Sequence, residues 1–440
     1  MNNVKITPEL IEKLDRSVKR DGKYRLAQNI LVKSDLRIAA RNYELINQVP
    51  QYFEIDLEPS SPTDQKNSGR CWLFGTLNSL RHQAEKKLKT ERVEFSESYL
   101  FFYDQLEKAN LFLENTIKYA GRKWTDRLVK RYFYYPVSDG GWDVWAGNLV
   151  DKYGLVPREV MPDHKNVSNT YASYSNLICR LLRRHGLKLR DLAAKDKDRA
   201  REYKEVALAD AYRLLCLTFG EPPKQFSWTY RDKKKKLHTF DNITPLEFKR
   251  KLVGRQKYLT LINNPAYAYG KTYRYRSIGQ GMVGKHILYL NLPFDQIRSV
   301  VVSELESKRA VVFSANVLPY NLMNNKDDKQ GVMSTRLYDW SNLLDIDTDI
   351  TKEGSVKSME GLANHEMLIV GLQKQNDKPA WWKVENSWGN EAGAKGFFAM
   401  DDDWFERYTE SIAIFERNLP EDLQKLAKQK PIVLGTDEEL

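Results

Sequence analysis

The segment that begins at Cys71 repeats its apolar residues at steps of three and four, which places them on one face of an α-helix. The apolar positions are Leu73, Leu77, Leu80, Ala84 and Leu88. The sequence therefore predicts a helix that runs from Cys71 to about residue 89. Residues 61–70, directly before it, are rich in Pro, Ser, Asn and Gly, and this composition predicts a loop.

Further helices are predicted on both sides of a second loop. A long apolar pattern covers residues 98–120, and a shorter one follows at 143–153. Between them, the loop at 137–142 holds the pair Gly140-Gly141. Residues 165–255 are strongly charged and are predicted to be mostly helical. The first 60 residues are predicted to form one short helix followed by a mostly extended lead-in.

From about residue 258 the pattern becomes typical of strands. Short apolar or alternating runs are separated by turn residues, and they include KYLTLINNP, AVVFSANV, HEMLIVGLQ, AWWKVENSWG and GFFAM. Helices come first and strands later, which predicts an α+β fold rather than an alternating βαβ fold. The chain divides by pattern into five regions: 1–60, 61–164, 165–257, 258–418 and 419–440.

The composition is that of a folded soluble protein, with 440 residues of which 41% are hydrophobic. No run approaches the roughly 20 apolar residues of a membrane span, and the N-terminus has no apolar signal core, so we expect a cytoplasmic protein. The three cysteines, Cys71, Cys179 and Cys216, are widely spaced. This spacing fits neither a disulfide framework nor a metal site.

The formal net charge of +11 leaves two interpretations open. A basic protein can bind nucleic acid through phosphate contacts, and the densest run of lysines is Lys233 to Lys236. No nucleic-acid recognition motif accompanies that run, so a solvated loop is the preferred interpretation.

Cys71 stands at the boundary between a loop and a long helix. Backbone N–H groups and the helix dipole at such a boundary favour a negative charge, which predicts a lowered thiol pKa and a reactive thiolate. A structural cysteine at a helix start is the alternative. Cys179 and Cys216 lie in apolar, helix-like stretches and are interpreted as core thiols.

Three other residues complete a candidate site for nucleophilic catalysis. His365 lies at the entrance of a strand-like run, where its ring could point into a cleft and act as the base. Asn386 follows 21 positions later, on a neighbouring strand predicted to be joined by the loop Gln373 to Lys378, and its oxygen could hold the imidazole. Gln65 and the backbone N–H of Cys71 could stabilise an oxyanion. Trp388 could cover the bond between His365 and Asn386.

The stretches QKNSGRCWLF, NHEMLIVG and VENSWG resemble the Gln–Cys–His–Asn set of papain-like peptidases. Arg70 stands where the papain signature has a second cysteine. The histidine follows the cysteine by 294 positions, against roughly 130–150 in the papain pattern, which indicates an insertion mainly at 165–255.

One branch is similar over most of the chain, namely the bleomycin hydrolase and aminopeptidase C family. Motifs that carry this resemblance include FSESYLFFYDQLEKANLFLE, SDGGWD, DKYGLVPREVMP, WTYRDKKKK and LYDW. The resemblance implies a papain-like fold with a helical insertion for oligomerisation, a homohexamer, peptide substrates and no metal or cofactor. It gives catalytic roles to Gln65, Cys71, His365 and Asn386. It also places the substrate backbone along Gly140 and Gly141.

The chain departs from the family pattern in two places. The family's C-terminal arm usually runs into the cleft, where its carboxylate meets the substrate's ammonium group, but here the tail after Leu434 is shorter. If it enters the cleft, the carboxylate of Leu440 or a neighbouring acid could hold an ammonium and give aminopeptidase action. If it stops short, oligo-endopeptidase action follows. Trp142, after the glycine pair, could be a wall of the substrate site or a core residue.

Overall fold

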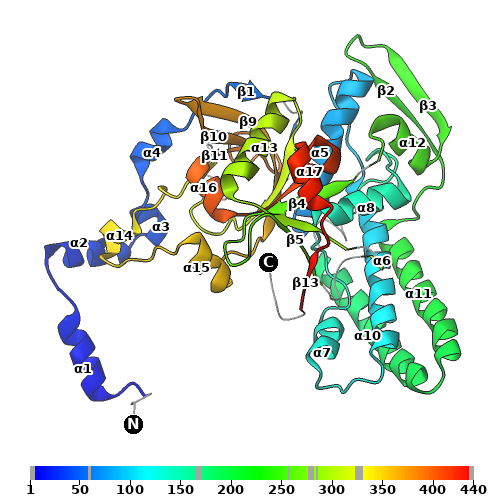
Figure 1. The fold of residues 1–440 in the computed structure, drawn as a ribbon, viewed down its shortest axis with the longest axis horizontal. Coiled ribbons are helices and arrows are strands. Elements are labelled where there is room, and N and C mark those ends of the chain that lie inside the picture. The colour runs from blue at the N-terminus through cyan, green and yellow to red at the C-terminus, as the bar shows by residue number, and fades with distance from the viewer. Residues whose placement is uncertain are drawn as a thin grey trace.

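We describe the fold from a computed structural model of the 440-residue chain. The residues described are 5–57, 61–164, 171–255, 257–275, 282–283, 286–322 and 331–435. A helical part and a sheet part lie side by side, and the long helix α5 lies between them (Figure 1). This arrangement agrees with the α+β class expected from the order of helical and strand-like patterns.

The helical part is built on long helices whose apolar faces share one core. That core reaches from Trp72 on α5 to Phe219 at the end of α11. Helices α6, α10 and α11 run alongside one another in Figure 1. The helices of this part are α5 (Cys71–Leu88), α6 (Glu97–Lys118), α7 (Arg127–Tyr134), α8 (Asp143–Tyr153), α10 (Tyr171–Lys195), α11 (Lys197–Phe219) and α12 (Pro245–Leu252).

A two-stranded hairpin interrupts the region that was expected to be mostly helical. Strands β2 (Phe226–Arg231) and β3 (Leu237–Ile243) pair antiparallel, and their aromatic rings pack on Phe248 of α12. The run Lys233 to Lys236 forms the tip, where Asp232 accepts from the backbone N–H groups of Lys234 and Lys236 at 2.9 Å. These strands alternate polar and apolar residues, and the sequence prediction did not separate this short alternating pattern from the charged helical patterns around it.

The described residues of the N-terminal region form four helices instead of one helix and an extended lead-in. They are α1 (Pro8–Ser17), α2 (Gly22–Leu31), α3 (Leu36–Ala39) and α4 (Tyr43–Gln48). A side-chain cap begins each of them, from Thr7, Asp21, Asp35 and Asn42. Helix α1 buries none of its residues and projects away from the body of the molecule (Figure 1).

Eleven strands form one sheet among the described residues. Its order is β13-β5-β6-β4-β12-β7-β9-β10-β11-β8, with β1 also paired to β9. The strands are β1 (Ile55–Asp56), β4 (Tyr258–Ile262), β5 (Lys271–Tyr275), β6 (Tyr289–Asn291), β7 (Val311–Ala315), β8 (Val332–Met333), β9 (His365–Gln375), β10 (Lys378–Glu385), β11 (Phe397–Asp401), β12 (Thr409–Phe415) and β13 (Ile432–Leu434). The remaining elements are α13 (Phe294–Glu306), α14 (Trp340–Leu344), α15 (Lys352–Lys357), α16 (Asp402–Tyr408), the short 3-10 helix η1 (Glu416–Asn418) and α17 (Glu421–Ala427).

Strands β9 and β10 form the hairpin that positions the histidine and the asparagine. The expected loop from Gln373 to Lys378 is only a two-residue turn, because Asn376 and Asp377 adopt positive φ angles of 51° and 60°. Such residues tolerate the left-handed region that a tight hairpin requires. The longer strands fix the register that brings the end of β10 opposite the start of β9.

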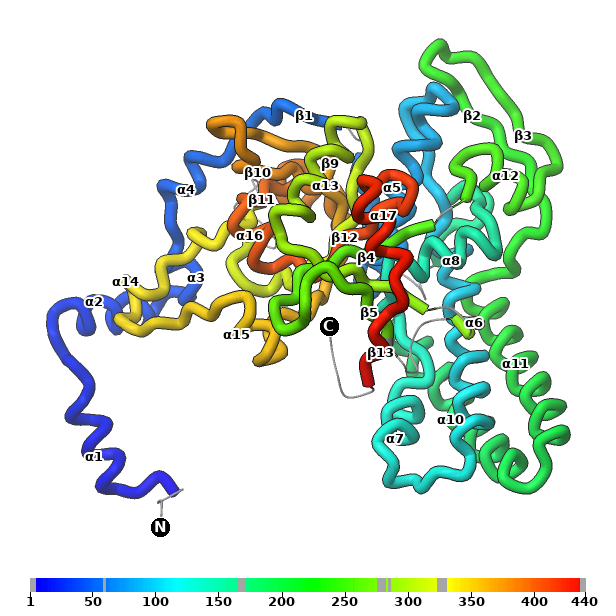
Figure 2. Tube along the Cα trace, in the orientation of Figure 1, coloured from blue at the N-terminus to red at the C-terminus, as the bar shows by residue number. Residues whose placement is uncertain are grey.

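The C-terminal segment adds the edge strand β13, which runs parallel to β5 (Figure 2). Leu434 is buried in a cluster with Tyr273 and Tyr289, and Trp142 packs against that cluster. The C-terminal segment is thereby held, as far as Leu434, close to Trp142, which directly follows the glycine pair.

Candidate active site

Cys71 is the first residue of α5, as the apolar pattern predicted. The backbone N–H groups of Trp72 and Glu366 lie beside its sulfur and favour the thiolate, so the start of the helix meets the start of β9 at this atom. The expected lowering of the thiol pKa is not found. Burial raises the pKa of Cys71 to about 12, and this effect outweighs the N–H donors.

His365 is the first residue of β9 and is buried. Its Nε2 lies 2.8 Å from Oδ1 of Asn386, which directly follows β10. The ring of Trp388 lies over the imidazole, with 4.8 Å between the ring centroids, and shields the bond from water as expected.

The hydrogen bonds of Asn386 assign the proton on His365. Oδ1 of Asn386 also accepts from the backbone N–H of Ser387 at 2.7 Å, which identifies this atom as the oxygen. An oxygen can only accept here, so Nε2 of His365 carries the hydrogen and Nδ1 is left as the basic nitrogen. Burial lowers the pKa of His365 to about 4, so the imidazole is neutral at pH 7.

We expect the acid limb of kcat/KM to fall near pH 4 rather than near the ordinary histidine value of 6.5. The folded-state pKa is lowered, so the basic form persists above it and is lost as the pH falls through it. A pH series of kcat/KM at constant ionic strength measures the limb. Recovery of activity after return to neutral pH separates titration from acid unfolding, and a limb near 6.5 would contradict the expectation.

Gln65 is buried and connects the loop before α5 to the segment after Asn386. Its Nε2 donates to the carbonyl of Ser68 at 2.5 Å, and its Oε1 accepts from Oγ of Ser387 at 2.6 Å. The backbone N–H of Gln65 also donates to the carbonyl of Ser387 at 2.8 Å. One N–H of the side-chain amide remains for another acceptor, as an oxyanion donor requires. Sequence reasoning did not single out Ser387, which joins Gln65 to Asn386.

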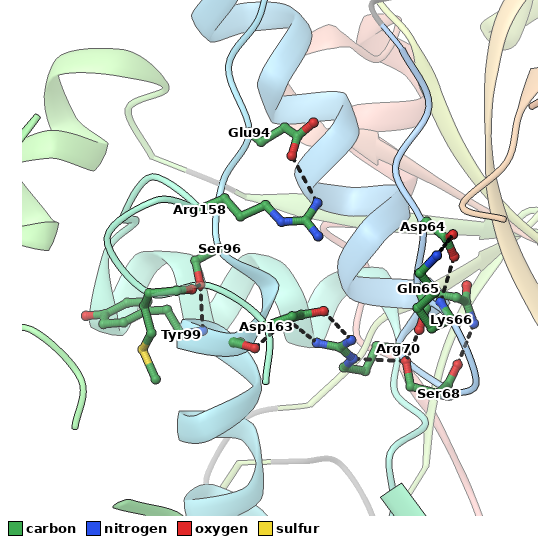
Figure 3. A network of polar contacts seen from close by, with 12 residues as sticks. Asp64, Gln65, Lys66, Ser68, Arg70, Glu94, Ser96, Tyr99, Arg158 and Asp163 are labelled. Carbon is green, nitrogen blue, oxygen red and sulfur yellow. Dashed lines mark hydrogen bonds and ion pairs between the residues drawn. The ribbon is translucent and has the colours of Figure 1, made fainter. Parts of the chain in front are cut away.

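Arg70, directly before the cysteine, is fully buried and forms a bidentate ion pair with Asp163 (Figure 3). Its two terminal nitrogens donate to the two oxygens of Asp163 at 2.9 and 2.8 Å. Its Nε donates at 3.0 Å to Oγ of Ser68, which in turn donates at 2.6 Å to the carbonyl of Gln65. The guanidinium thus anchors the loop that carries both Gln65 and Cys71.

The glycine pair lies on the loop before α8, and a lysine side chain of α6 holds the first of its two carbonyl groups. Lys108 donates to the carbonyl of Gly140 at 2.6 Å. A Cβ on Gly141 would lie 2.5 Å from the ring of Trp72, whereas one on Gly140 would meet nothing within 4 Å. Packing against Trp72 therefore requires the glycine at 141, and the open side of Gly140 is where a peptide can approach.

Trp142 is half-buried and contacts the cluster that holds the C-terminal strand. It therefore belongs partly to the core, beside the loop that carries Gly140 and Gly141. Leu440 lies outside the described residues. In the described part of the chain, no helix is long and apolar enough to span a membrane. The same residues contain no group of three or more His, Cys, Asp or Glu side chains placed to hold a metal ion.

The sequence model of the Peptidase C1-like family matches residues 5–439. Aminopeptidase C of Lactobacillus helveticus is 34% identical over 439 residues, which cover 98% of this chain and 96% of the relative. Bleomycin hydrolase of Homo sapiens is 30% identical over 451 residues, covering 99% and 98%. The crystal structure of PepW from Lactobacillus rhamnosis HN001 superposes with a TM-score of 0.91 at 31% identity, covering 98% of each chain.

Proposed function

Because this chain belongs to the Peptidase C1-like family, we propose that it is a cysteine aminopeptidase that removes residues from short peptides through a thioester on Cys71. The observation that carries the proposal is the 2.8 Å bond between His365 and Asn386 at the strand start that meets the Cys71 sulfur. The names of the relatives, aminopeptidase C and bleomycin hydrolase, support the same activity.

The proposed reaction proceeds in two steps. In the first, the proton of Cys71 passes to Nδ1 of His365 while the sulfur attacks the substrate carbonyl, and the backbone N–H of Cys71 and Nε2 of Gln65 stabilise the oxyanion. His365 then protonates the departing amine. In the second, His365 takes a proton from water, the resulting hydroxide cleaves the thioester, and the thiol is restored. The transfer creates the thiolate and the imidazolium together, which offsets the cost of burying each charge alone.

The course of the C-terminal segment favours removal of N-terminal residues over internal cleavage. Leu434 belongs to a buried cluster against which Trp142 packs, so the C-terminal segment lies, as far as Leu434, close to the residue that follows Gly140 and Gly141. In the proposed complex an acidic group of this end binds the free ammonium of the substrate, a role expected for the carboxylate of Leu440. If the end leaves the cleft open, oligo-endopeptidase action is the alternative.

Acetylation of the substrate's N-terminus is expected to lower kcat/KM by on the order of 30- to 4,000-fold. This range corresponds to the roughly 2–5 kcal/mol that is lost when one partner of a buried charge pair is removed. The measurement compares a peptide with its acetylated form, and mass spectrometry maps the products. Internal cuts in the blocked peptide would support the endopeptidase alternative, and the Cys71→Ser variant reports any contaminating peptidase.

The homohexamer and the cytoplasmic location stay predictions. Binding of nucleic acid at Lys233 to Lys236 is the weaker alternative, although these residues form an accessible hairpin tip. Phosphate contacts release counterions, so such binding would weaken steeply with salt. A flat salt response in a binding assay would remove this alternative.

A further inference from the structure

Glu366 follows the candidate base His365 and is almost completely buried, at 3% exposure. Successive side chains of a strand point to opposite faces, so its carboxyl points away from the imidazole and toward α5. Gly75, one turn after Cys71, makes room for it, because a Cβ there would lie 3.1 Å from Oε1 of Glu366. The missing side chain at Gly75 thus leaves space for the Glu366 carboxyl, one helical turn from the candidate nucleophile Cys71.

The Glu366 residue meets all three segments that form the site. Oγ of Ser314 on β7 donates to its Oε2 at 3.2 Å. The hydroxyl of Thr76 on α5 and the backbone N–H of Asp143 on α8 lie close to the same carboxyl, although the Thr76 hydroxyl has no hydrogen-bond partner there. Its own backbone N–H lies beside the sulfur of Cys71 and favours the thiolate. One side chain therefore links the strand of His365, the helix of Cys71 and the helix that follows Gly140-Gly141.

The charge around this carboxyl is unusual. The titratable groups that face it are Cys71 on α5, Asp143 on α8 and Tyr258 on β4. Among the residues that the structure describes, no lysine, arginine or histidine forms an ion pair with Glu366 or Asp143, and Oε1 of the first and Oδ2 of the second have no hydrogen-bond partner. Two buried acids without a cation cannot both be ionised at modest cost.

The protonation of the pair follows from this environment. Burial raises the pKa of Asp143 to about 7, and burial together with Asp143 raises the pKa of Glu366 well above its ordinary value. An ionised Glu366 would in turn raise the pKa of the Cys71 thiol, because its negative charge opposes the thiolate. The neutral acid is the form that is compatible with a reactive cysteine.

We propose that Glu366 is a positioning residue that works as a neutral carboxylic acid, holding the segments of His365, Cys71 and Gly140-Gly141 together, and that its ionisation switches the nucleophile off. The proposal rests on the proposed function in one respect, namely that Cys71 is the nucleophile. A merely structural glutamate would affect the stability of the fold but not the ionisation of the Cys71 thiol, so the pH dependence of Cys71 alkylation distinguishes the two roles.

The test measures kcat/KM and the rate of Cys71 alkylation by iodoacetamide across the pH range, with the alkylation of Cys71→Ser subtracted. Glu366→Gln keeps the shape of the neutral acid and cannot ionise. We expect it to stay within about threefold of the natural protein at neutral pH and to retain kcat/KM at alkaline pH, where the natural protein loses it. Its alkylation curve should move to lower pH by about one unit, because the negative charge is gone.

Two further variants sharpen the test. Asp143→Asn removes the charge that keeps Glu366 protonated, so the alkaline loss of activity should move to lower pH. Glu366→Ala loses the contacts, and kcat/KM should fall on the order of 100-fold at every pH, as for a small displacement of catalytic groups. Glu304→Gln is the matched control, because Glu304 on α13 is equally buried but pairs with Arg309, which follows that helix. Its profile should stay unchanged.

A Glu366→Gln profile that coincides with that of the natural protein would overturn the proposal, and so would a loss as large as that of Glu366→Ala. Activity that survives in Cys71→Ser would instead overturn the proposed function. The alkylation curves are independent of any substrate, so the two failures can be told apart.

Discussion

Replacing Cys71 by serine lowers kcat/KM by about 10,000-fold or more in the expected outcome, because the variant lacks the only sulfur that meets the start of β9 among the described cysteines. A serine hydroxyl is a far weaker acid than a thiol, and His365, with its pKa lowered to about 4, is a poor base for it. Initial rates on a fluorogenic peptide measure the loss of kcat/KM. Circular dichroism of the purified variant checks that its fold is unchanged.

Cys216→Ser is the matched control for this variant. Cys216 is half-buried on α11 and is free, as Cys71 is, but it packs in the core of the helical part. Its replacement is expected to leave kcat/KM unchanged. Retained activity in Cys71→Ser, or an equal loss in both variants, would exclude Cys71 as the nucleophile.

The second large effect concerns stability. Asp163→Ala leaves the fully buried guanidinium of Arg70 without its bidentate partner, and we expect a loss of about 3–5 kcal/mol in the free energy of unfolding. Chemical denaturation measures this loss. Activity should fall with it even below the transition, because Arg70 also holds the loop of Gln65.

An exposed ion pair provides the comparison for Asp163. Asp349 pairs with Arg407 at 2.6 Å, but its side chain is 70% exposed, so Asp349→Ala should cost less than about 1 kcal/mol. The double variant Arg70→Met with Asp163→Ala should recover part of the stability, since it removes the unpaired charge itself. If Asp163→Ala is no less stable than Asp349→Ala, the buried pair has no such role.

Local patterns predicted the parts of the site that depend on one segment. Cys71 begins its helix because the apolar period starts there and the loop before it is rich in turn residues. His365 begins its strand for the same kind of reason, and the spacing to Asn386 fitted one hairpin. Each of these signals lies within about 20 residues of sequence, where periodicity and turn chemistry act.

The sequence could not reveal partners that come together only in the fold. Arg70 and Asp163 are 93 positions apart, and Asp163 has no distinguishing neighbours in the sequence. Glu366 was read as one residue of an apolar strand, and its relation to Gly75 depends on how α5 crosses β9. The prediction of a lowered pKa for Cys71 was wrong for a similar reason. The helix start that favours the thiolate can be predicted from local sequence, but the burial that raises the pKa depends on the whole fold.

The parallel pairing of β13 with β5 also decides how the protein can be handled. An affinity tag fused to the C-terminus would follow β13, and Leu434 of that strand is buried in the cluster against which Trp142 packs. Such a fusion would add foreign chain to a segment whose last strand is paired to β5 in the sheet. The N-terminus is the better place for a tag, because α1 buries none of its residues and extends into solvent.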